Sequence, residues 1–249
     1  EMAAVKERGF EVDVFCAFPG NGDSALPAAS PLSDCPITRP PVPLAAHAWY
    51  RAARAAILAP RRVGQSIALR MQHRKRNLYE WARTLRDLRI AAVFANRARS
   101  RGVRHLHAHF AFMPADIARM MAELHGSSWS VSVHARDIYT QGGLSLADRL
   151  AGAAFVTTCT EHGRQTVANT VGNLLECSPL LVRHGIDTDV FTPPAERPSK
   201  PLIAAVGRLE EKKGFRFLVR ACRCLKDKGV PFHCVLAGDG ELRQPLLQL

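Results

Sequence analysis

Residues 105–134, HLHAHFAFMPADIARMMAELHGSSWSVSVH, form one strand-helix-strand pattern. An apolar strand is predicted at 105–110, a helix at 114–125 and a second strand at 129–134. Strands and helices that alternate at this spacing favour a parallel sheet covered by helices. Ligands bind beyond the carboxyl ends of the strands in such sheets, so the residues that follow each strand are the first candidates for a functional site.

The same alternation continues downstream. Helical patterns at 145–150 and 161–171 separate strands predicted at 153–159 and 179–183. The first domain is therefore predicted to be an α/β domain that extends to residue 191.

Upstream of this stretch, a strand is predicted at residues 11–16, and Gly, Pro, Ser and Asn cluster over 18–43 as in a long surface loop. Residues 45–98 have a helical pattern. Four apolar residues in it fall at three- and four-residue spacings that put them on one helix face: Leu78, Trp81, Leu85 and Leu88. Basic residues are predicted on the opposite face: Lys75, Arg76, Arg83 and Arg86.

A proline-rich segment marks a domain boundary. Residues 192–201 contain four prolines and no apolar periodicity, which is typical of a linker. A second unit follows, with a strand at 201–206, a helix at 214–228 and a strand at 232–237. We therefore expect a first domain over 1–191, a linker over 192–201 and the start of a second domain over 202–249. Both ends of the chain are expected to be cut within a fold.

The net charge of +12 is concentrated in one segment. Sixteen Arg or Lys residues lie between Arg39 and Arg104, against only Glu80 and Asp87. Such a segment attracts phosphate groups of nucleic acid, anionic lipid or a phosphorylated substrate. The seven cysteines show no Cys-x-x-Cys pair, which predicts reduced, buried thiols in a cytoplasmic protein. A spanning helix is not predicted, since no apolar run reaches 18 residues.

A glycine- and lysine-containing motif follows the first strand of the second unit: Ala205-Val-Gly-Arg-Leu-Glu-Glu-Lys-Lys-Gly-Phe215, with Gly238-Asp-Gly240 after the next strand. This order resembles the start of the donor-binding domain of the family-four glycosyltransferases. Four upstream blocks resemble the acceptor domain of that family, in the same order: His105–Phe110, Ser132–Tyr139, Thr158–Glu161 and Val182–Phe191. The chain is most similar to the branch that builds colanic acid and other surface polysaccharides.

The resemblance implies the GT-B fold, which has two Rossmann-like domains with parallel sheets, the second incomplete in this chain. It also implies transfer of a sugar, with retention of configuration, from a nucleotide-diphosphate sugar to a saccharide acceptor that is expected to be lipid-linked. Neither a metal nor another cofactor is expected. The family's Glu-x(7)-Glu block, which grips the donor sugar and ribose, does not follow Gly240.

The resemblance also assigns roles to individual residues. Gly207 would let the backbone approach the donor, and Arg208 and Lys213 would neutralise the departing diphosphate. His134, at a predicted strand end, would face the donor sugar and hydrogen-bond a hydroxyl or the diphosphate. The acceptor side of the cleft would include further polar residues: His109, Arg136 and Asp137.

Two alternatives from other classes stay open. A metal-dependent hydrolase would use His105, His107 and His109, which alternate along one strand and so project to one face. A nucleic-acid-binding protein would explain the basic segment, but that segment lacks interleaved aromatic residues and a recognition motif, so no nucleic acid is expected. We instead expect segment Arg39 to Arg104 to bind an anionic membrane surface, which places the protein peripherally at the inner face of the cell membrane.

Overall fold

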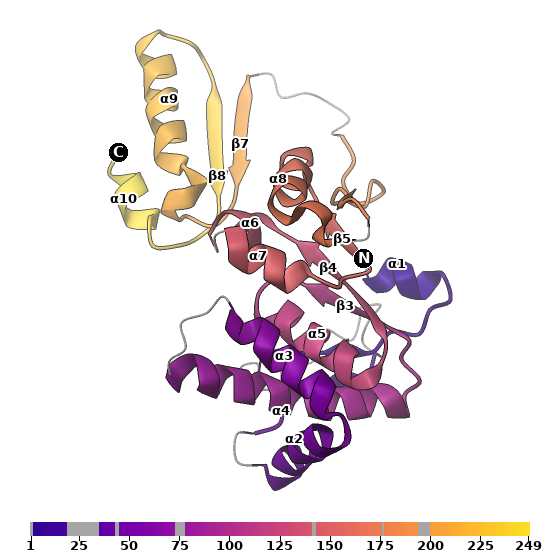
Figure 1. The fold of residues 1–249 in the computed structure, drawn as a ribbon. Coiled ribbons are helices and arrows are strands. Elements are labelled where there is room, and N and C mark those ends of the chain that lie inside the picture. Colours follow the sequence, from indigo (N-terminus) through magenta and orange to yellow (C-terminus); the bar gives the residue numbers. More distant parts are fainter. Residues whose placement is uncertain are drawn as a thin grey trace. The chain divides into compact units, whose positions relative to one another are not determined.

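The computed structural model describes residues 2–18, 35–42, 45–72, 78–140, 143–175, 177–193 and 200–249 (Figure 1). The chain divides into two compact units, Glu1–Gly185 and Ile186–Leu249. Both units are mixed α/β structures in which every strand pair is parallel among the described residues. The predicted linker at 192–201 falls within the second unit, and its residues 194–199 lie outside the described residues.

A four-stranded parallel sheet organises the first unit. Its strands lie side by side in chain order: β3 (His105–His109), β4 (Ser128–Val133), β5 (Phe155–Thr158) and β6 (Leu180–Leu181). Four helices connect them: α5 (Met113–His125), α6 (Ala135–Tyr139), α7 (Gly143–Leu150) and α8 (Glu161–Val171), the last followed by the short η1 (Gly172–Leu174). The predicted alternation of strands and helices is therefore confirmed, and α6 is an additional helix that directly follows β4.

One face of this sheet forms the core. Leu106 and Ala108 of β3 are buried, and they join Val131 and Val156 in a cluster with apolar side chains of α5, α7 and α8. Side chains alternate across a strand, so the other face carries the polar residues of the same strands. The three histidines of β3 all lie on that face, as predicted, and each has exposed surface.

Three helices precede the sheet: α2 (Ala46–Leu58), α3 (Pro60–Gln72) and α4 (Leu78–Ser100). The predicted apolar face of α4 is only partly correct. Leu88 is buried, but Leu78, Trp81 and Leu85 are 86%, 42% and 44% exposed. Periodicity identifies the apolar face of a helix, whereas burial also needs a neighbour alongside it, and the buried part of α4 begins at Thr84.

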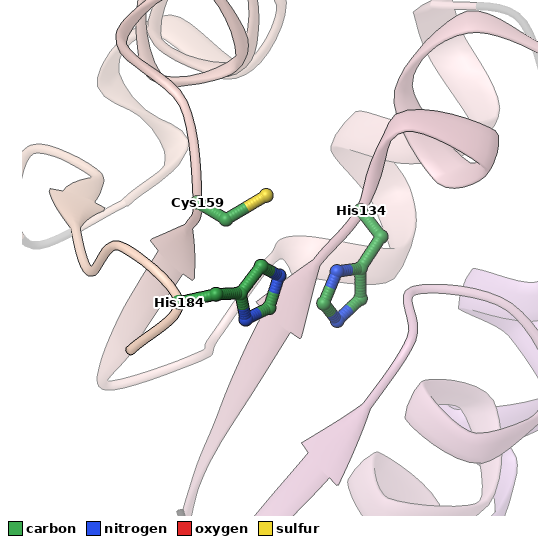
Figure 2. A group of neighbouring side chains, drawn as sticks. All are labelled: His134, Cys159 and His184. Atoms are coloured by element: carbon green, nitrogen blue, oxygen red, sulfur yellow. The ribbon is translucent and has the colours of Figure 1, made fainter. Parts of the chain in front are cut away.

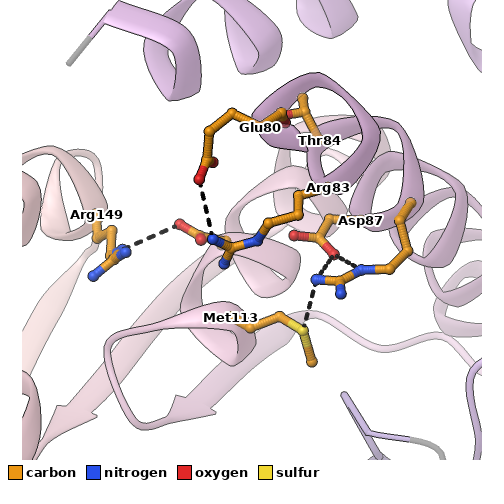
Figure 3. A network of polar contacts seen from close by, with 8 residues as sticks. Glu80, Arg83, Thr84, Asp87, Met113 and Arg149 are labelled. Carbon is orange, nitrogen blue, oxygen red and sulfur yellow. Dashed lines mark hydrogen bonds and ion pairs between the residues drawn. The ribbon is translucent and has the colours of Figure 1, made fainter. Parts of the chain in front are cut away.

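A polar network joins α4, α5 and α7 (Figure 3). The carboxylate of Asp87 is fully buried and accepts a 2.8 Å hydrogen bond from Nε of Arg86. That guanidinium also contacts Sδ of Met113 on α5, at 3.0 Å. On the other side, Arg149 of α7 lies 3.6 Å from the carboxylate of Asp116 on α5. Arg86 gives the buried Asp87 carboxylate the partner that burial requires. The contacts of Arg86 with Met113 and of Arg149 with Asp116 cross between helices and help fix them against one another.

A second, smaller sheet pairs β1 (Val14–Phe15) with β2 (Ile37–Thr38), downstream of helix α1 (Met2–Glu7). It is tied to α4, because the Phe15 and Phe94 rings lie 5.3 Å apart and Asp13 pairs with Arg101 at 3.1 Å. Strand β2 falls within the loop predicted at 18–43, which is a correction to that prediction. Residues 19–34 and 43–44 of the loop lie outside the described residues.

The second unit is a strand-helix-strand element. Strands β7 (Leu202–Val206) and β8 (His233–Ala237) are parallel, with Leu202 opposite His233. Between them lie η2 (Glu211–Lys213) and α9 (Phe215–Asp227), and α10 (Arg243–Leu247) follows β8. The predicted strands and helix of this unit are confirmed.

The cysteines differ from the prediction of buried thiols. All seven are free, but only Cys35 is buried, while Cys177 and Cys224 are exposed. Cys234 shows why. It lies on β8, where even the inward-facing residues are only half-buried, so an apolar strand pattern did not guarantee burial of the thiol.

Candidate functional site

The carboxyl ends of β4, β5 and β6 bring three side chains together: His134, Cys159 and His184 (Figure 2). His134 follows β4 directly, Cys159 follows β5 directly, and His184 lies three residues beyond β6. Parallel strands end at the same edge of a sheet, which explains why residues so far apart in sequence meet here. They border a small pocket of about 10 Å³, roughly the space of one water molecule.

The backbone of His134 is held by Asp137. The His134 amide donates to Oδ2 of Asp137 at 2.9 Å, and this carboxylate is fully buried at the start of α6. Asp137 thus fixes the turn that aims His134 and has no surface exposed to an acceptor. The predicted cleft residue Arg136 is exposed, with its guanidinium 6.0 Å from the centre of the Phe112 ring.

His134 and the predicted cleft residue His109 are in direct contact. Their Nε2 atoms lie 3.1 Å apart, and the rings of Phe110 and His184 lie 4.8 Å and 5.7 Å from the His134 ring. A hydrogen bond between two Nε2 atoms requires one ring to carry the proton and the other to accept it. Either ring can be the donor, and in both cases the contact orients the two imidazoles relative to one another.

The other two strand histidines form a ladder with the serines of β4. His105 bonds Ser128 at 2.8 Å and Ser130 at 2.7 Å, and His107 bonds Ser130 at 2.7 Å and Ser132 at 2.9 Å. Both ring nitrogens of each histidine thus have a hydroxyl partner, which does not favour the strand histidines as ligands of a hydrolase metal. Although His105 has exposed surface, the partial loss of solvent around its ring lowers the pKa of the imidazole, which favours its neutral form.

The start of α8 lies at the same sheet edge. Thr160 caps the helix, since its hydroxyl accepts from the Gly163 amide at 3.0 Å. A Cβ on Gly163 would lie 2.7 Å from the hydroxyl of Thr158, so only glycine fits there without displacement. Glu161 accepts two hydrogen bonds from Arg164, at 2.8 and 2.5 Å, and this pairing lowers the pKa of the Glu161 carboxyl to about 2.

In the second unit, the three residues predicted to bind a diphosphate lie on one connection, between β7 and α9. A Cβ on Gly207 would lie 3.2 Å from the Phe215 ring and 4.0 Å from Cδ of Lys213, so the stem of Lys213 runs past Gly207. Gly238 is required by close approach, because a Cβ there would be driven into the carbonyl of Gly207. The glycines of this region therefore pack two backbone turns against each other.

The cations of this connection are partly engaged by neighbouring carboxylates. Glu210 pairs with Arg208 at 2.6 Å and with Lys212 at 3.2 Å, and Arg216 pairs with Glu211 at 2.8 Å. The Arg208 side chain is 67% exposed, and ion pairs between exposed side chains are weak. An incoming anion can therefore replace Glu210 as the partner of Arg208, while Lys213 is exposed beside the start of α9.

Comparison with known proteins gives two curated relatives. The chain is 42% identical over 69 residues, 27% of its length and 17% of the relative's, to the putative colanic acid biosynthesis glycosyltransferase WcaL of Escherichia coli K12. It is 28% identical over 158 residues, 55% of the chain and 40% of the relative, to the putative glycosyltransferase EpsF of Bacillus subtilis 168. It thus spans less than half the length of either. No protein-family profile matches the chain.

Cys159 and His184, which lie next to His134, were not among the predicted site residues. Cys159 falls under the prediction of buried thiols, and His184 lies in the Val182–Phe191 block without a predicted role of its own. Both come shortly after predicted strands of one parallel sheet, so the rule that strand ends converge was a signal that could have identified them. Among the described residues, no helix is long and apolar enough to cross a membrane.

Proposed function

We propose that the chain is part of a retaining family-four glycosyltransferase of the GT-B type. It would transfer a sugar from a nucleotide-diphosphate donor to a saccharide acceptor in surface polysaccharide biosynthesis. The observation that carries the proposal is the placement of Gly207, Arg208 and Lys213 on one connection between a strand and the helix that follows it. Both relatives are named as glycosyltransferases, which supports the same class of reaction.

The second unit is proposed to bind the donor diphosphate. Arg208 and Lys213 would place two cations on the leaving group, where negative charge develops as the bond to the sugar breaks. Helix α9 has 13 residues, and the amides of its first turn would add partial positive charge at the same connection. On this proposal, the two side chains take the role that a divalent cation has in other transferases, so no metal is needed in the reaction.

The first unit is proposed to supply His134. A neutral imidazole at a strand end can donate to or accept from a sugar hydroxyl, and its contact with His109 and the bond from its amide to Asp137 would keep it oriented. His134 would thus position the donor sugar, with His109 and Arg136 on the acceptor side.

The acceptor is proposed to be lipid-linked and to be met at the inner face of the cell membrane. Aromatic side chains of α2 and α4 support membrane contact, because Trp49, Tyr50, Tyr79 and Trp81 are between 42% and 68% exposed. Arg83 accompanies Tyr79, with its guanidinium 5.7 Å from the centre of that ring. Arg89, 5.5 Å from the centre of the Trp49 ring, is itself buried and holds Trp49 in place from the inner side. Residues 73–77, which include Arg74, Lys75 and Arg76, lie outside the described residues.

The direct test is a titration of the isotope-labelled chain with uridine diphosphate or guanosine diphosphate, with binding detected by NMR. The proposal expects the amide signals of residues 207–214 to shift, with weak affinity, because the family's Glu-x(7)-Glu block is not in this chain. Arg208→Ala should remove the shifts, whereas Arg220→Ala, a change at an exposed position of α9, should leave them. Shifts confined to other residues, or none at millimolar nucleotide, would remove the diphosphate site.

A further inference from the structure

We propose that His134, Cys159 and His184 together bind one divalent cation of the zinc class. Their ligand atoms all lie within 4.8 Å of one another. They come from the carboxyl ends of three neighbouring parallel strands and all belong to the first unit. In Figure 2, the two imidazole rings lie side by side, each with a nitrogen towards the other, and the thiol of Cys159 is directed to the same space.

The spacing is close to what a zinc ion requires. Zinc lies about 2.0–2.1 Å from imidazole nitrogen and about 2.3 Å from thiolate sulfur, so tetrahedral ligands are roughly 3.3–3.6 Å apart. The most widely separated ligand atoms would therefore have to approach by up to about 1.5 Å. His184 is exposed, and small rotations of its side chain would suffice to bring it closer.

The chemistry of the donors selects the ion. One thiolate and two imidazoles suit Zn²⁺, whereas Mg²⁺ and Ca²⁺ prefer carboxylate and carbonyl oxygens. Three protein ligands leave a fourth tetrahedral position for water, and the adjoining pocket of about 10 Å³ has room for one. Binding would form a metal–sulfur bond, break the S–H bond of Cys159 and release that proton to solvent.

The surroundings of His134 resemble those of metal-ligating histidines. Such a histidine usually binds the metal through one ring nitrogen and hydrogen-bonds a partner through the other. Nε2 of His134 is 3.1 Å from Nε2 of His109, so an ion held at Nδ1 would leave that contact intact. Asp137 fixes the backbone of His134 from the buried side. The proposed site uses neither Arg208 nor Lys213, but it shares His134 with the proposed contact to the donor sugar, so an ion bound there would occupy that side chain. The test below measures metal binding and needs no sugar transfer.

Calorimetric titration of the chelator-treated chain with Zn²⁺ tests the proposal. We expect one Zn²⁺ bound per chain with a micromolar or lower dissociation constant, and no binding of Mg²⁺. Cys159→Ser and His184→Ala should each weaken Zn²⁺ binding by about 100-fold or more, and His109→Ala by about 10-fold, since outer partners of a ligand contribute about 10- to 100-fold. His184 is exposed, so its replacement preserves the fold, which circular dichroism would verify.

Two control variants separate this site from other thiols. Cys177→Ser alters an exposed thiol in the same unit, and Cys234→Ser disrupts the hydrogen-bonded pair Cys222 and Cys234 in the second unit. With Co²⁺ as the probe, a thiolate-to-metal absorption band should appear and should be lost in Cys159→Ser alone. Loss of the band in Cys234→Ser with retention in Cys159→Ser, or no 1:1 binding of Zn²⁺, would overturn the proposal.

Discussion

Replacing Arg208 by alanine should separate catalysis from stability. The Arg208 side chain is 67% exposed and pairs with Glu210 at 2.6 Å. An exposed pair contributes roughly 0–1 kcal/mol to folding, so the variant should unfold at nearly the same denaturant concentration as the parent chain. The kinetic test uses a protein that includes this chain and is as long as its relatives. There, turnover should fall by about 100-fold or more, which is a rise of about 2.7 kcal/mol in the activation free energy and the scale of one lost preorganised charge stabiliser.

Matched variants make this test sharper. Lys213→Ala should lower turnover on the same scale, and His134→Ala should also lower it. Glu210→Gln removes the competing carboxylate, so diphosphate binding should tighten, by up to about fivefold if the pair contributes up to about 1 kcal/mol. Steady-state kinetics with a nucleotide-sugar panel would measure the first three, and calorimetry with the diphosphate the last. Unchanged turnover in Arg208→Ala and Lys213→Ala would refute the proposed charge stabilisation.

Three further predictions concern the first unit. Phe94 is fully buried, so Phe94→Ala should lower the free energy of unfolding by about 3–5 kcal/mol. The control Phe10→Ala, at an exposed position, should lower it by about 0.5 kcal/mol or less. Urea denaturation monitored by tryptophan fluorescence measures both, and equal losses would contradict the described packing. Because the pKa of Glu161 is lowered to about 2, its stabilising contribution should be full above about pH 4.5 and lost as pH falls towards 2. NMR titration of the Glu161 carboxyl measures this, and a midpoint near the ordinary pKa of 4.5 would contradict the prediction. Sedimentation with liposomes should increase with anionic lipid and decrease with salt, and Arg51→Glu with Arg54→Glu should weaken it; equal binding to neutral liposomes would exclude the membrane proposal.

The sequence was most informative where one pattern had one structural outcome. Alternation of strand and helix from residue 105 onwards predicted the parallel sheet, and it placed His109 and His134 near the carboxyl edge. Burial was harder to predict, as Trp81 shows, because a helix face is buried only where a neighbour covers it. The rule that strand ends converge could have made Cys159 and His184 candidates, but residue spacing alone does not reveal that β4, β5 and β6 are neighbours in the sheet.

The ladder of β3 histidines and β4 serines has a direction. Ser130 has a single hydroxyl proton and bonds both His105 and His107, so it can donate to only one of them and must accept from the other. Each neutral imidazole likewise donates at one nitrogen and accepts at the other, and Ser132 extends the series to Thr157 at 2.8 Å. All the donors must therefore point the same way along the series. The tautomers of His105 and His107 therefore change together or not at all. Five side chains on β3 and β4, with a sixth on β5, form one hydrogen-bonded series that has two states, which differ in the direction in which every bond is donated.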